Sequence, residues 1–123
     1  MSAIGSFSAG FLYNTYGLIG SISDAFMKDA YNAETVSSLL NAQVTLADNF
    51  TKMLDDLMKE KTIVKKSDTE YINSTTAIIK GLKKQALLLA DIAQTNSSKK
   101  RNLYEEQRKM NWAAISKLMG IDE

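Results

Sequence analysis

The chain contains no proline in its 123 residues. Because proline removes a backbone N–H and clashes with the preceding turn of a helix, a chain without it can form long, uninterrupted helices. Apolar residues recur at helical spacing throughout the sequence, and no stretch alternates between apolar and polar residues as a strand does. The sequence therefore predicts a single all-α domain over residues 1–123, with three or four helices.

The clearest helical pattern lies in the second quarter of the chain. Val36, Gln43, Phe50 and Leu57 are spaced by seven residues, and further apolar residues fill the positions between them. This spacing is typical of an amphipathic helix with one buried stripe. We expect it to form the first arm of a long antiparallel helical hairpin over residues 34–93. The predicted hairpin core consists of Leu39, Leu46, Phe50, Met53, Ile78, Leu82, Ala86 and Leu89.

Polar and basic residues mark the predicted helix ends. The hairpin is expected to turn at 61–66, where lysines flank two β-branched residues. Ser67 and Glu70 have the spacing of a capping box, which predicts a helix start at this point. A polar break precedes a last helix over 99–119, and Gly120 is a suitable C-terminal cap. The predicted packing face of this last helix is Leu103, Met110, Ala114 and Leu118.

Residues 1–60 can form one helix or two. Asn32 and Thr35 are able to cap a new helix, but nothing in the sequence around them forces a break. Both possibilities therefore stay open at the level of the sequence.

The first 23 residues carry no charged side chain. A helix that is apolar around most of its circumference is normally surrounded by other helices, and we expect a chain of this length to supply too few of them. Residues 1–30 are therefore predicted to be an assembly helix that other subunits bury. A stripe of small residues at four-residue spacing, Gly17, Ser21 and Ala25, is expected to let neighbouring helices approach closely. The predicted interface residues are Phe7, Phe11, Leu12, Gly17, Leu18, Ile19, Ser21, Ile22 and Phe26.

The composition argues against catalysis. Histidine and cysteine are both absent, which removes the commonest general base and the commonest metal ligands. The adjacent carboxylates Asp55 and Asp56 project from a helix in different directions and do not form an acid–base pair. We therefore predict no enzyme activity, and no catalytic, cofactor-binding or metal site.

Charge is nearly balanced overall, with 15 basic and 14 acidic residues and a net charge of +1. A general nucleic-acid-binding protein usually has a clear basic excess. The basic cluster at 99–101 lies near Tyr104 and Trp112, a combination that can bind single strands. Glu105 and Glu106 dilute this cluster, so a solvated helix face is the preferred interpretation and nucleic acid is an unexpected partner.

These features predict a structural protein that assembles with copies of itself, with other assembly proteins as possible partners. An uncharged, glycine- and serine-containing N-terminal segment followed by long amphipathic helices resembles, in layout only, subunits of bacterial secretion filaments and small phage virion proteins. One alternative is a membrane-active translocon or ejection-type protein that contacts the membrane through residues 1–23. Another is a helical chaperone or adaptor that covers a partner protein.

The N-terminal segment is a poor targeting signal. No basic residue precedes its apolar part, and glycine and polar residues dilute it below what a membrane span requires. We therefore expect a cytoplasmic or virion-associated protein, or one exported by a dedicated secretion system that uses no signal peptide.

Overall fold

A computed structural model describes residues 3–60 and 66–120 of the chain. The described residues form four helices and no strand, which confirms the predicted all-α class. The helices are α1 (Ala3–Met27), α2 (Ala33–Lys59), α3 (Lys66–Thr95) and α4 (Ser98–Met119).

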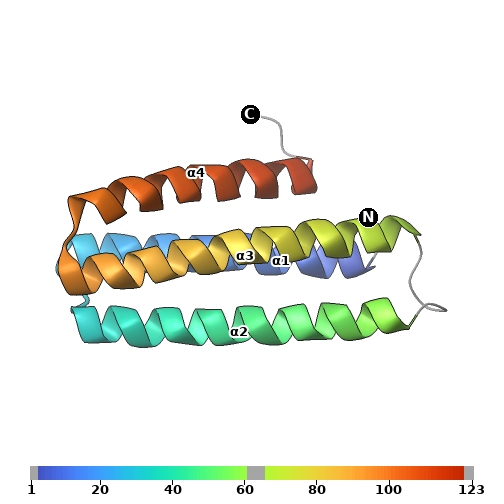
Figure 1. The fold of residues 1–123 in the computed structure, drawn as a ribbon, viewed down its shortest axis with the longest axis horizontal. Helices are drawn as coiled ribbons and strands as arrows, with labels where there is room; N and C mark the ends of the chain where they lie inside the picture. The colour runs from blue at the N-terminus through green and yellow to red at the C-terminus, as the bar shows by residue number, and fades with distance from the viewer. Residues whose placement is uncertain (1–2, 61–65, 121–123) are drawn as a thin grey trace.

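Consecutive helices are antiparallel to each other (Figure 1). α1 and α3 lie in the middle of the bundle, and α2 and α4 lie at its opposite edges. α3 contacts all three other helices, whereas α2 and α4 do not contact each other within the described residues. Each edge helix therefore keeps a wide exposed face.

Residues 28–32 divide the first sixty residues into two helices. Asp29 has a positive φ of 61°, and the N–H of Ala30 donates to the carbonyl of Ala25 at 2.8 Å, as in a Schellman motif. The side chain of Asn32 then accepts from the N–H of Thr35 at 2.8 Å. Asn32 therefore caps α2, and the described part of residues 1–60 contains two helices, one of the two possibilities left open by the sequence.

The other helix ends follow the polar signals in part. Asn96 adopts a positive φ of 54°, Ser97 caps α4, and Gly120 ends α4 with a φ of 73°, as predicted. The turn predicted at 61–66 falls mainly on residues 61–65, outside the described part of the chain. α3 begins at Lys66, so Ser67 is already inside the helix and does not stand at the capping position predicted for it.

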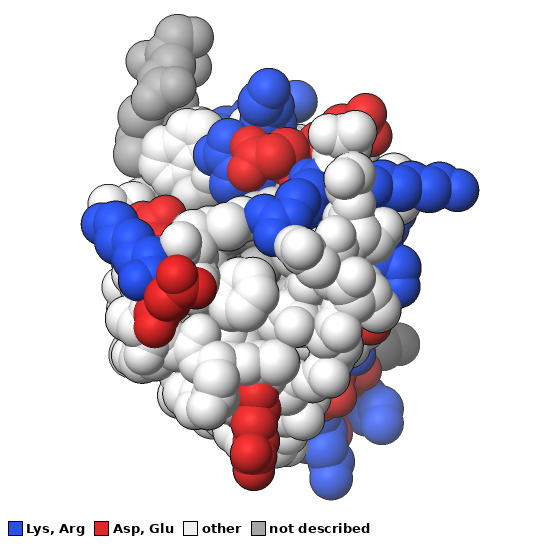
Figure 2. All heavy atoms as spheres, turned by 90° about the vertical axis from the view of Figure 1, so that its left-hand side faces the viewer, with Lys and Arg blue, Asp and Glu red and all other residues white. Residues whose placement is uncertain are grey.

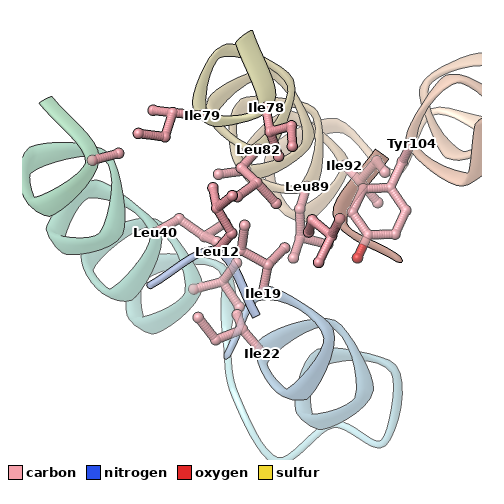
Figure 3. Close-up of a cluster of buried hydrophobic side chains, with 14 of the residues drawn as sticks. Leu12, Ile19, Ile22, Leu40, Ile78, Ile79, Leu82, Leu89, Ile92 and Tyr104 are labelled. Carbon is pink, nitrogen blue, oxygen red and sulfur yellow. The ribbon is translucent and has the colours of Figure 1, made fainter. Parts of the chain in front are cut away.

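Each helix contributes to one continuous core (Figure 3). Full burial of a large aliphatic side chain contributes about 1.5–3 kcal/mol relative to exposure, so these residues hold the bundle together. The large aliphatic side chains with under 2% exposure are Leu12, Ile19, Val36, Leu40, Leu54, Ile72, Ile79, Leu82, Leu89, Ile92 and Ile115.

Three of the four core residues predicted on α2 are wrong by one position, whereas the fourth, Phe50, is partly buried and packs against the core. Leu40, Ala47 and Leu54 occupy the core, whereas Leu39, Leu46 and Met53, predicted to be core residues, are exposed. The predicted core residues of α3 (Ile78, Leu82, Ala86 and Leu89) are all buried. Both stripes of α2 repeat every seven residues, so the spacing alone could not decide which of them faces α3.

Candidate assembly surface

The uncharged helix α1 is buried largely by its own chain. Leu12, Ile19 and Ile22 pack into the core with α3 and α2 (Figure 3). The expectation that other subunits must cover these three residues is therefore wrong. The expectation was that one chain has too few helices to cover α1, but α2, α3 and α4 all contact α1.

The opposite side of α1 faces outwards. Phe7 is 74% exposed and Leu18 is about half exposed. Gly17 and Ser21 of the predicted small-residue stripe are exposed on this side, and an added Cβ at Gly10 or Gly17 would meet no atom within 4 Å. The small residues therefore do not bring α1 close to another helix of its own chain. Phe11 and Phe26 are half-buried at the margin of the core.

The exposed stripe of α2 lies beside this side of α1. The rings of Phe11 and Phe50 are stacked, with centroids 4.2 Å apart and planes 3° apart. Leu46 and Met53 are four residues before and three residues after Phe50, so helical periodicity places them on the same side of α2. The α1/α2 surface is defined by Phe7, Leu18, Leu39, Leu46 and Met53.

A hollow lies at the end of the α1/α2 surface that is near the start of α1. It has a volume of about 200 Å³ and is lined mainly by apolar side chains. Phe7 comes from α1, whereas Phe50, Met53 and Leu57 come from α2. Such a hollow can accept one flexible apolar side chain from another molecule.

Charges are segregated between the two edges of the bundle. α2 has four acidic and two basic residues, a net charge of −2, whereas α4 has six basic and two acidic residues, a net charge of +4. Figure 2 shows the end of the bundle that bears the α1–α2 and α3–α4 connections. Lys and Arg gather over its upper part, where α4 lies, and an uncharged area covers its middle.

α4 attaches to α3 through buried polar side chains. Asn111 donates to Gln85 at 2.8 Å, Gln107 donates to Asn111 at 2.9 Å, and Gln85 donates to Tyr104 at 3.4 Å. Burial raises the pKa of the Tyr104 phenol above its ordinary value, although hydrogen bonds with Gln85 and Ser23 oppose this effect. This buried hydrogen-bond chain was not predicted from the sequence, although Tyr104, Gln107 and Asn111 recur at helical spacing.

The aromatic residues near the basic cluster are packed against α1. The ring of Trp112 lies 5.3 Å from Tyr16 and 6.3 Å from Tyr13, measured between centroids. Arg108 donates to the hydroxyl of Tyr16 at 3.2 Å, and its bonds to Glu105 and Tyr16 raise its pKa further. Trp112 therefore contributes to the attachment of α4 and is not a free stacking platform beside the lysines.

The outer face of α4 differs from the prediction. Leu103 and Met110 were expected to pack inwards, but they are 42% and 65% exposed. Ala114 and Leu118 are partly buried against the core, as predicted. The buried positions of α4 are Tyr104, Gln107, Asn111, Ile115 and Ser116. The expectation that apolar residues lie inside failed for Leu103 and Met110, because α3 presents the polar side chain of Gln85 to α4.

The described residues contain no group of three or more acidic residues placed to hold a metal ion. None of the four described helices combines the length and the apolar character that a membrane crossing requires. No protein-family model matches the sequence, and no curated protein or solved structure is significantly similar to it. The surface chemistry of the chain is therefore the basis for a functional proposal.

Proposed function

We propose that this protein is a non-enzymatic structural subunit that assembles with copies of itself through the α1/α2 surface. The observation that carries the proposal is a band of large apolar side chains exposed along two adjacent helices. Monomeric proteins rarely expose contiguous apolar patches beyond a few hundred Å². Covering this band with another subunit removes it from water, at about 25 cal/mol for each Å² of apolar surface.

The part of α1 that is proposed to contact a partner is smaller than the sequence suggested. Phe7, Gly17, Leu18 and Ser21 are exposed and available to a partner, whereas Leu12, Ile19 and Ile22 already belong to the core. Leu39, Leu46 and Met53, predicted to be core residues, join the interface instead. A secretion filament or a phage virion is the proposed type of assembly, and this part of the proposal rests on the layout of the chain alone.

Sedimentation velocity of the wild-type chain and two variants tests the proposal. Leu46→Asp places a charge in the α1/α2 surface, and we expect it to raise the dissociation constant of assembly at least tenfold. Leu87→Asp is a matched control, because both leucines are 52% exposed and Leu87 lies on α3, outside that surface. It should assemble as the wild type does, and circular dichroism should show that both variants remain helical.

A wild-type chain that stays monomeric at micromolar concentration would contradict the proposal. The same samples with liposomes test the membrane-active alternative, in which the wild type would bind vesicles instead of itself. Stoichiometric capture of one other protein by the monomer would favour the chaperone or adaptor alternative.

A further inference from the structure

The outward edge of α4 carries an apolar pair that the described part of its own chain leaves exposed. Leu103 and Met110 are exposed and lie seven residues apart, on the same side of the helix. Lys99 and Lys117 lie at matching helical positions before and after this pair. We name Leu103 and Met110 the α4 edge.

The α4 edge matches the α1/α2 surface in spacing. Leu39, Leu46 and Met53 also repeat every seven residues, and a seven-residue repeat corresponds to about 10.5 Å along a helix. Two helices with the same apolar repeat can interdigitate their side chains over several turns. The unbranched side chain of Met110 also suits the apolar hollow beside Phe7 and Met53.

The charges of the two helices are complementary as well. α4 has a net charge of +4 and α2 of −2, and these helices do not contact each other within the described chain. Asp48 is paired with Lys83 of α3, and Lys100 is paired with Asp91 of α3. In the described part of the chain no ion pair is seen for the acids Asp55 and Asp56 of α2, or for Lys99, Lys109 and Lys117 of α4.

We propose that the α4 edge of one copy packs on the α1/α2 surface of the next copy, so that the subunits associate head to tail. This contact rests on the self-assembly proposed above, and it makes the α4 edge the surface that binds the α1/α2 surface. α2 and α4 lie at opposite edges of the bundle (Figure 1), so each subunit presents one surface of each kind. Such a heterologous contact repeats into a ring or an open filament, whereas a contact between two identical surfaces stops at a dimer.

The alternative symmetric contact pairs two α1/α2 surfaces. It would bring two net-negative α2 helices together and would leave Leu103 and Met110 exposed. The head-to-tail contact joins helices of opposite net charge and covers both apolar stripes. The charges and the exposed apolar residues therefore both favour a second copy bound through its α4 edge.

Complementation between two variants tests this contact. Leu46→Asp disables the α1/α2 surface and keeps the α4 edge, whereas Met110→Asp disables the α4 edge and keeps the α1/α2 surface. Each variant alone should be monomeric under conditions where the wild type forms species larger than a dimer. An equimolar mixture should form a one-to-one dimer that grows no further, because each dimer retains one disabled surface of each kind.

Leu87→Asp again provides the control, because it should assemble like the wild type and should not form a capped dimer with either variant.

The wild-type dissociation constant should also rise at least tenfold between about 0.1 M and about 1 M NaCl, as the Debye length shortens from about 10 Å to about 3 Å. Circular dichroism and the emission of Trp112 should show that both interface variants retain the fold with α4 docked.

The outcomes separate this inference from the function on which it rests. If Met110→Asp assembles like the wild type while Leu46→Asp does not, self-assembly stands and the head-to-tail contact is overturned in favour of a symmetric one. A mixture that remains monomeric overturns the head-to-tail contact as well. A wild-type chain that never assembles overturns both proposals.

Discussion

Leu40 and Leu46 are the same residue type on the same helix, yet they have different surroundings. Leu40 is buried in the core of the bundle, whereas Leu46 is exposed on the α1/α2 surface. The number of core neighbours that each side chain meets determines how much it contributes to the stability of a single subunit. This contrast provides a direct test of the corrected register of α2.

Leu40→Ala should lower the free energy of unfolding by about 2–5 kcal/mol, because it leaves a cavity in the core. Leu46→Ala should change it by no more than about 0.5 kcal/mol, because the lost contacts are at the surface. Urea denaturation, at concentrations where sedimentation shows both variants to be monomeric, measures the two values. Equal losses would mean that the α2 register described above is incorrect.

At the scale of the element, the α3–α4 contact depends on a glycine in the middle of a helix. A Cβ added to Gly81 would overlap the Oδ1 of Asn111 and would lie 3.1 Å from the Nε2 of Gln107. Both atoms belong to the buried hydrogen-bond chain that attaches α4. Gly81 therefore sets the close approach of these two helices.

Gly81→Ala should destabilise the protein by about 1–3 kcal/mol, the usual cost of overpacking. Gly20→Ala is the matched control, since a Cβ at Gly20 would meet no atom within 4 Å and alanine in a helix is favoured by about 0.5–1 kcal/mol. Chemical denaturation followed through Trp112, the single tryptophan, reports on α4 directly because its ring packs on α1. A stabilising effect of Gly81→Ala would contradict the close contact.

At the scale of the whole molecule, Tyr104 links the attachment of α4 to pH. Its phenol is buried where α4 meets the core, and burial raises its pKa above the ordinary value of 10.0. Above about pH 10 the unfolded chain ionises this phenol before the folded chain does. The unfolded state then binds fewer protons, so the stability of the fold decreases as pH rises towards the folded-state pKa.

We expect this component of the pH dependence to disappear in Tyr104→Phe. Below about pH 10 the difference in unfolding free energy between wild type and variant should be constant, and above it the wild type should lose stability faster. Lysine titration is common to both proteins, so it cancels from the comparison. Parallel stability curves across this range would show that the buried phenol contributes nothing.

The all-α class, the α3 core and several helix ends followed from the sequence alone. They depend on local chemistry: the absence of proline, the spacing of apolar residues along one helix, and capping groups such as Asn32 and Gly120. Each of these effects acts within a few residues along the chain, so it can be recognised without knowing the partner helices.

The tertiary structure alone determined which stripe of α2 and which face of α4 are buried. Both stripes of α2 are apolar and repeat every seven residues, and only the packing of α2 against the rest of the bundle selects Leu40 over Leu46. In α4, Asn111 is buried because it donates a hydrogen bond to Gln85 of α3, whereas Met110 is exposed. The burial of a side chain depends on which neighbours face it, and residues distant in the sequence supply those neighbours.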